Sequence, residues 1–156
     1  MVVYPSTEDE ILHAVSDSAR KKLKMKVVTG FSHTVPKLAC LGSGDGAGIL
    51  ISTQKYKNEI TVDKATMTVT VDRGVGLRDL LDVVAASGLA LLAAPYWDDL
   101  SLGGFLSTWT HGNSLWRRGG AVHDYVVSMR LVVPASQGEG YAKVITVRLA
   151  QPQSGW

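Results

Sequence analysis

The stretch from Pro95 to Asp124 constrains this chain more than any other, because its composition is not that of a hydrophobic core. It combines adjacent glycines with three tryptophans, two histidines and two neighbouring arginines. Gly103 and Gly104 carry no Cβ, so the backbone there can pass close to a ligand. Short hydroxyl side chains are interspersed at Ser101, Thr108, Thr110 and Ser114. Glycine-rich loops of this kind commonly bind phosphates through backbone N–H groups. The stretch has neither the GK[ST] of a P-loop nor a GxGxxG after a strand.

The N-terminal segment predicts a strand, a helix and a second strand. Strands at 2–4 and 26–29 flank a helix that begins after a capping box at Ser6 or Thr7 and runs to about Lys24. Its apolar stripe follows helical spacing, at Ile11, Leu12, Val15, Ala19 and Leu23. Strands joined through a helix normally pair in parallel by a right-handed crossover. Because ligands bind at the carboxyl ends of such strands, the loop 30–34 is placed to contact one.

The middle of the chain predicts a hairpin and a second helix. A strand at 48–53 is followed by two alternating segments, 59–63 and 66–72, that form an antiparallel hairpin about the turn 63–66. The next helix has its apolar residues at Leu77, Leu80, Leu81 and Val84. We expect this helix to end at Gly88 as the C′ residue.

The last third predicts two strands after the glycine-rich stretch. The apolar segment 89–93 is expected to be buried, and the pair His123–Asp124 is expected to start a strand rather than to form a catalytic pair. The first strand ends at Pro134 and carries one apolar face, made of Val127, Met129, Leu131 and Val133. A turn at 137–140 and a strand at 141–149 follow.

Composition excludes several functional classes. The chain has 156 residues, 46% of them hydrophobic and 19% charged, which is typical of one globular domain. The net charge is +2 without a basic stripe, so a nucleic-acid partner is not expected. The cluster Arg20, Lys21, Lys22 and Lys24 instead complements a helix dipole. Cys40 is the single cysteine, which rules out an internal disulfide, and no apolar run is long enough to span a membrane. Histidines and cysteines lack zinc-ligand spacing.

Two segments resemble the flavin loops of one enzyme family. The order Ser101-Leu102-Gly103-Gly104, then a TxxH, then His111-Gly112 resembles the second pyrophosphate loop of the vanillyl-alcohol-oxidase type FAD-binding domain. The segment VVTGFSH at 27–33 resembles its first flavin loop. With VVYPSTEDEI at 2–11 and AVHDYVVSMRLVVPA at 121–135, the chain looks most like the L-gulono-1,4-lactone oxidase-like proteins of plants. The resemblance covers roughly residues 2 to 145.

This resemblance implies an α+β fold of the FAD-binding PCMH type. It would consist of a small strand–helix–strand lobe and a mixed, largely antiparallel lobe, with FAD between them. Residues 1–150 would form this domain in part, without its C-terminal portion, and 151–156 would be a non-matching tail. The start also looks truncated, because the family usually begins with a targeting segment; its members are secreted or membrane-associated.

The resemblance further implies FAD-dependent oxidation of an aldonolactone in ascorbate biosynthesis. The substrate would be L-gulono-1,4-lactone or D-arabinono-1,4-lactone, with oxygen as acceptor. A second domain, absent here, would bind this lactone, so we expect the chain alone to be inactive and assign no catalytic residue. Two alternatives stay open. The chain could be an inactive flavin-binding remnant, or a protein-interaction module without flavin whose surface is formed by Trp97, Trp109 and Trp116.

Carried over residue by residue, the resemblance assigns a cofactor site. His33 matches the histidine that bonds covalently to the flavin 8α-methyl in aldonolactone oxidases. His111 is either a structural cap of its loop or a flavin contact, and His13 is expected to face solvent. Trp109 departs from the family, which has glycine there, so we expect it to hinder the fit of flavin. The cofactor-binding set is Gly30, Phe31, Ser32, His33, Thr34, Pro95, Ser101, Leu102, Gly103, Gly104, Thr108, His111, Gly112 and Val122.

Overall fold

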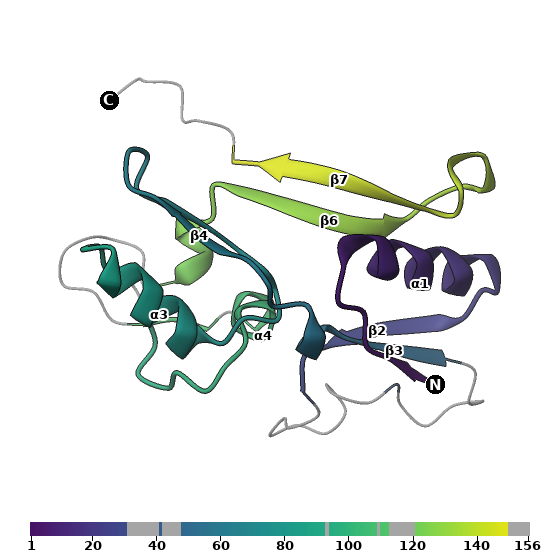
Figure 1. Ribbon diagram of the computed structural model, residues 1–156. Coiled ribbons are helices and arrows are strands. Elements are labelled where there is room, and N and C mark those ends of the chain that lie inside the picture. The colour runs from purple at the N-terminus through teal and green to yellow at the C-terminus, as the bar shows by residue number, and fades with distance from the viewer. Residues whose placement is uncertain (31–40, 42–47, 93, 109, 113–120, 150–156) are drawn as a thin grey trace.

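A three-stranded parallel sheet forms the base of the N-terminal region. The computed structural model describes residues 1–30, 41, 48–92, 94–108, 110–112 and 121–149. Strands β1 (Val2–Val3) and β2 (Lys24–Val28) both pair in parallel with β3 (Gly48–Ser52), which lies between them. The predicted parallel strand–helix–strand unit is therefore confirmed, with β3 inserted between its two strands. All three strands end at the same edge of the sheet (Figure 1).

Helix α1 (Glu8–Arg20) begins as its sequence predicts and ends earlier. The Thr7 hydroxyl accepts a hydrogen bond from the Glu10 N–H, and the Glu10 carboxylate accepts one from the Ser6 N–H. Thr7 is therefore the N-cap, and the reciprocal bond of the predicted capping box goes instead to the N–H of Ser6, one residue before the cap. The helix was expected to reach Lys24 but stops at Arg20, because Lys22 adopts a positive φ of 53° that turns the chain into β2. His13 is exposed, as predicted.

The C-terminal hairpin covers the face of α1 that the sheet leaves open. Its strands, β6 (Ser128–Pro134) and β7 (Ala142–Arg148), pair antiparallel, and α1 lies between this hairpin and the parallel sheet (Figure 1). Val132 and Ala142 join Val15 and Ile51 in one core. The predicted apolar face of β6 points the other way, because strand residues alternate between faces. On that outer face Val127 and Met129 are 56% and 37% exposed.

The second region is built on a hairpin and two helices. Strands β4 (Ile60–Asp63) and β5 (Thr68–Val71) form the predicted antiparallel hairpin. Helix α3 (Leu77–Ala86) packs Leu77 and Leu80 against it and ends at Gly88, whose φ of +78° gives the expected C′ residue. The short helix α4 (Leu102–Ser107) and the 3-10 turn η2 (Val122–Tyr125) share a core in which Phe105 is buried.

Two predictions about this second region are wrong. His123 and Asp124 lie in the 3-10 turn η2, and β6 begins only at Ser128, so the pair does not start a strand. Of the segment 89–93, the structure describes 89–92, and these residues are only partly buried: Leu89 and Leu91 pack against the core, but Leu92 is 51% exposed. Both segments are too short to show a period in sequence, and their packing depends on neighbours that come later in the chain.

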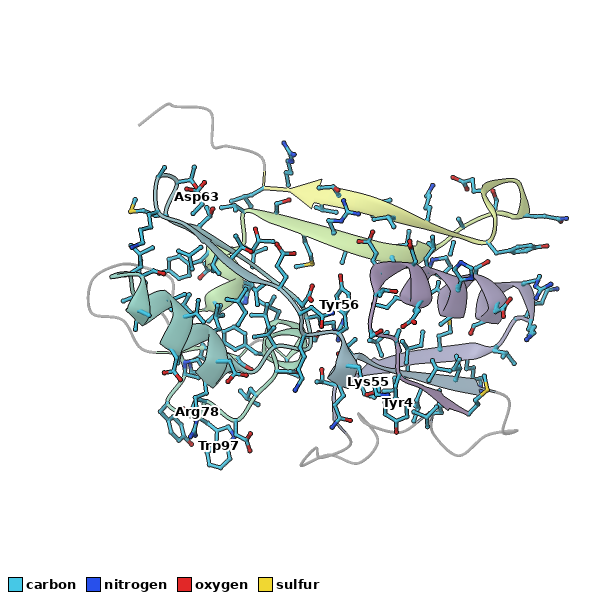
Figure 2. All side chains as sticks on the ribbon, in the orientation of Figure 1. Tyr4, Lys55, Tyr56, Asp63, Arg78 and Trp97 are labelled. Carbon is cyan, nitrogen blue, oxygen red and sulfur yellow. The ribbon has the colours of Figure 1, made fainter. Side chains whose placement is uncertain are left out.

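A tight joint connects the two regions. The 3-10 turn η1 (Thr53–Lys55) follows β3 directly, and the loop after β5 packs on it at Gly74. The Gly74 N–H donates to the carbonyl of Tyr56 at 2.8 Å. Tyr56 lies between the regions (Figure 2), where burial and then the nearby Asp72 carboxylate raise the pKa of its phenol. The ends of the parallel strands are thereby fixed beside the second region.

Candidate cofactor-binding site

Four hydroxyl side chains meet where the parallel strands end. Thr29 follows β2, Ser52 ends β3, Thr53 begins η1, and Ser101 caps the N-terminus of α4. The Thr29 hydroxyl lies 2.8 Å from that of Ser101 and 2.9 Å from that of Thr53. Ser52 donates to the Thr29 carbonyl at 2.8 Å. The segment that precedes Gly30 therefore contacts the SLGG segment, although 72 residues separate Thr29 from Ser101.

The SLGG segment is a helical turn whose backbone donors are used within the chain. The N–H groups of residues 102–105 all donate over 2.8–3.2 Å, the first two to the carbonyls of Val75 and Arg73 and the last two to Ser101. Phosphate binding through these amides, which the glycine pattern suggested, would require them to exchange partners. The hydroxyl groups are likewise bonded to one another, so a ligand would contact the bare glycine backbone or exchange these hydrogen bonds.

The absence of a side chain has a different structural consequence at each of the two glycines of this turn. A Cβ on Gly103 would lie 2.2 Å from Cγ and 2.3 Å from Nε of Arg73, so a side chain there would collide with Arg73. A Cβ on Gly104 would meet only the Ser101 hydroxyl, at 3.2 Å. Gly104 thus presents open backbone surface beside the hydroxyl cluster, and the residues present fit a ligand that approaches the main chain closely.

Arg73 brings a guanidinium with an unpaired Nε against the same turn, at Gly103. Its Nε is buried, and it has no hydrogen-bond partner among the residues that the structure describes. Burial lowers the pKa of its guanidinium. Neither Arg73 nor Thr29, Ser52 and Thr53 belonged to the predicted cofactor set. Thr29 could have been found from its position directly before the first flavin loop, whereas the packing of Arg73 leaves no signal in the sequence.

The structure describes most of the second predicted flavin loop and little of the first. Gly30 follows Thr29, but Phe31, Ser32, His33 and Thr34 lie outside the described residues, as does Trp109. Pro95 and Val122 are buried, Thr108 is exposed, and Gly112 is half-buried. The Thr108 hydroxyl donates to the Gly104 carbonyl at 2.9 Å. His111 is exposed and forms an isolated backbone bridge with Ala121, so its side chain is accessible beside this loop.

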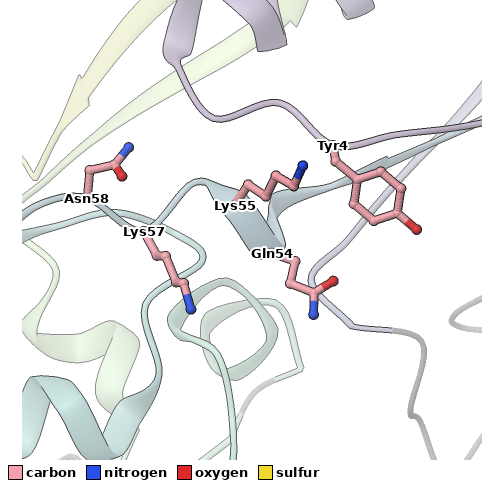
Figure 3. Close-up of a pocket in the computed structure, with 5 residues that line it drawn as sticks. All are labelled: Tyr4, Gln54, Lys55, Lys57 and Asn58. Atoms are coloured by element: carbon pink, nitrogen blue, oxygen red, sulfur yellow. The ribbon is translucent and has the colours of Figure 1, made fainter.

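A concave surface lies beside η1, whose first residue, Thr53, belongs to the hydroxyl cluster. It is lined by Tyr4, Gln54, Lys55, Lys57 and Asn58, and its volume is about 640 Å³ (Figure 3). The Lys55 ammonium lies 5.9 Å from the centre of the Tyr4 ring, within cation–π range. Tyr4 follows β1, the other four residues lie in η1 or just after it, and none of the five was predicted as part of a site.

Of the three tryptophans of the predicted interaction surface, the structure describes only Trp97. Trp97 is 57% exposed and its neighbour Tyr96 is 99% exposed. Trp97 lies near Arg78, which forms an ion pair with Asp98 (Figure 2). Trp109 and Trp116 lie outside the described residues, so a shared surface stays a prediction. Among the residues that the structure describes, no three His, Cys, Asp or Glu side chains could hold a metal ion.

Comparison with known proteins assigns the class of this chain. Residues 1–139 match the family model described as FAD binding domain, so the chain belongs to this family and binds FAD. The fold agrees: a solved solvent-stable cholesterol oxidase matches with a TM-score of 0.79 at 21% identity, covering 94% of this chain and 29% of that one. An alkyldihydroxyacetonephosphate synthase matches with a TM-score of 0.73 at 21% identity, covering 95% and 26%. The predicted α+β fold of the PCMH-type flavoenzymes is thus confirmed.

Within this class, the chain is homologous to L-gulonolactone oxidases. It is 49% identical over 144 residues to L-gulonolactone oxidase 3 of Arabidopsis thaliana, which covers 92% of this chain and 24% of that protein. It is 29% identical to the L-gulonolactone oxidase of Scyliorhinus torazame, covering 84% and 28%. The chain thus spans about a quarter of the length of these relatives. In the described part of the chain, no helix has the length and apolar character needed to cross a membrane.

Proposed function

We propose that this chain is the FAD-binding part of an aldonolactone oxidase, with L-gulono-1,4-lactone or D-arabinono-1,4-lactone as substrate. The hydrogen bond between Thr29 and Ser101 carries this proposal, because it joins the segment before the first predicted flavin loop to the start of the second. The names of the curated relatives support the lactone as substrate class.

The domain boundaries belong to the same proposal. Residues 1–150 would form the FAD-binding unit, and 151–156 would be a tail outside it. The lactone would be bound by residues in the three quarters of the relatives' length that this chain does not match. A substrate carbon must be held about 3–3.5 Å from its acceptor to react, so positioning requires that further part. The chain by itself is therefore expected not to turn over lactone.

The residues of this chain would bind and orient the cofactor. FAD supplies the chemistry, since its flavin accepts a hydride from the substrate carbon. Ser101 and Thr29 offer hydroxyl groups at the strand ends, and Gly104 offers bare backbone. We further propose the predicted roles of His33 as the covalent attachment point and of His111 as a flavin contact. A neutral imidazole near pH 7 is suited to form the bond to the flavin.

Acid precipitation of the FAD-loaded chain tests this proposal. Yellow colour should remain in the washed precipitate, and His33→Ala should move it to the supernatant as free FAD. The matched control is His13→Ala, which removes an exposed histidine from α1. Oxygen uptake with added L-gulono-1,4-lactone should stay at the level of free FAD. A colourless protein would favour the interaction module, and free FAD released from the unsubstituted chain would disprove the covalent link.

A further inference from the structure

Arg73 occupies the space that Gly103 leaves open. It follows β5 and Asp72 directly, and its carbonyl accepts the Gly103 N–H at 2.9 Å. Its Cγ and Nε lie only 2.2 and 2.3 Å from the position that a Cβ on Gly103 would take. The aliphatic part of the Arg73 side chain is therefore held against the first turn of α4. The N-cap of this turn, Ser101, is the residue that hydrogen-bonds Thr29.

The charge of Arg73 has no counterpart among the described residues. Arg78 pairs with Asp98 at 2.8 Å and Arg130 with Glu8, but no described carboxylate pairs with Arg73. Its neighbour Asp72 instead accepts the N–H groups of Asn58 and Glu59. The Arg73 Nε is buried without an acceptor among the described residues, and this is costly because buried polar groups require hydrogen bonds.

We infer that Arg73 binds the pyrophosphate of FAD, as an anion-binding residue whose partner is the ligand itself. This inference rests on the proposed role of the chain as a FAD-binding part. The guanidinium is a planar fork that matches phosphate oxygens with paired hydrogen bonds. The pyrophosphate carries the full negative charges of oxidised FAD. Arg73 packs against Gly103, two residues after Ser101, whose hydroxyl hydrogen-bonds Thr29.

Gly103 acquires a specific role under this inference. Its missing side chain makes room for Arg73, so this glycine serves the ligand through the arginine and not by direct contact. The N–H groups of the same turn are engaged within the chain, which leaves a side-chain cation to bind the phosphates. Arg73 is thus a binding residue for the cofactor and has no part in the hydride transfer.

The test compares Arg73→Met with Arg78→Met, a matched loss of charge from the exposed pair with Asp98. Binding of FAD, ADP and riboflavin to the full chain is titrated by flavin fluorescence and, for ADP, by calorimetry. Arg73→Met should weaken both FAD and ADP by about tenfold or more, because charge-assisted hydrogen bonds are lost. Riboflavin, which has no phosphate, should bind unchanged, and Arg78→Met should bind all three as the unsubstituted chain does.

Thermal melting without ligand separates binding from folding. Replacing an unpaired buried charge by an apolar side chain of similar length should leave the Tm unchanged or raise it. If Arg73→Met lowered the Tm and weakened riboflavin binding as much as FAD binding, Arg73 would be a structural residue and the inference would be overturned. Should the methionine variant not fold, Arg73→Lys provides the same comparison, with a smaller loss for FAD. If Arg73→Met bound FAD as tightly as Arg78→Met and the unsubstituted chain, only the role of Arg73 would be overturned. If the unsubstituted chain bound no FAD, the proposed function would be overturned as well.

Discussion

The two arginines Arg130 and Arg73 show how differently the two regions of this molecule are built. On the hairpin over α1, Arg130 binds both carboxylate oxygens of Glu8, and this hydrogen bonding raises the pKa of its guanidinium. Beside α4, Arg73 has a buried Nε without a partner, and burial lowers the pKa of its guanidinium. Arg130 of the α1 region thus has its partner within the chain, whereas Arg73 beside α4 keeps a buried Nε without a partner among the described residues.

The same contrast holds for glycine and hydroxyl groups. In the β6–β7 hairpin, Gly140 makes a turn with a φ of +77° and its carbonyl accepts the Ser16 hydroxyl at 2.6 Å. At the α4 turn, a Cβ on Gly104 would meet only the Ser101 hydroxyl among the described residues, and that hydroxyl bonds Thr29 of the other region. The first glycine shapes a turn within its region, and the second lies beside the contact that joins the two regions.

The joint at Gly74 offers the strongest way to break this arrangement. A Cβ there would lie 2.0 Å from the Thr53 carbonyl oxygen and 2.3 Å from that of Tyr56, and backbone atoms cannot give way cheaply. Gly74→Ala should lower the free energy of unfolding by about 1–3 kcal/mol and weaken FAD binding. Urea unfolding and FAD titration measure both effects.

Gly138→Ala is the control for this substitution. No atom of the described residues lies within 4 Å of a Cβ on Gly138, in the turn between β6 and β7, so the exchange should be close to neutral for stability and for FAD. If Gly74→Ala matched this control in both measurements, the two regions would not depend on a close joint.

Glu139 gives a smaller effect that is confined to the α1 region. Its hydrogen bond with Lys143, followed by those with Ser136, lowers the pKa of its carboxyl to about 2, from 4.5. Since the folded pKa is depressed, the stabilisation is present above pH 4.5 and is lost as the pH falls towards 2.

Glu139→Gln should therefore lower the Tm slightly at pH 7 and not at pH 2, which melting curves across this range would detect. FAD affinity at pH 7 should not change, because the turn lies in the other region. A Tm difference that stayed constant with pH would show that the carboxylate charge is not its cause.

Local patterns predicted well those elements of both regions that depend on residues close in sequence. These are the Thr7 cap of α1, the alternation in β4 and β5, and Gly88 after the end of α3. The early end of α1 was missed because a positive φ at Lys22, a lysine, has no sequence signature.

The α4 region was less predictable because it is held together by distant contacts. Two glycines in a row disfavour a helix, yet α4 forms since its first N–H groups donate to the Val75 and Arg73 carbonyls. The resemblance of the SLGG segment to a flavin loop gave the ligand class, which the family match confirms. It did not give the burial of Arg73 or the hydroxyl cluster, because both depend on how the loop after β5 packs.

The contact between Thr29 and Ser101 is the most direct test of the claim that the two segments form one cofactor site. FAD should be titrated into the unsubstituted chain, Thr29→Val, Ser101→Ala and the double variant, with Ser16→Ala as a control from the α1 region. We predict that each single substitution weakens binding about fivefold, as for one hydrogen bond of about 1 kcal/mol, and that the double variant is little weaker than either. Absence of FAD binding by the unsubstituted chain, or single variants that bind as tightly as Ser16→Ala, would contradict this account.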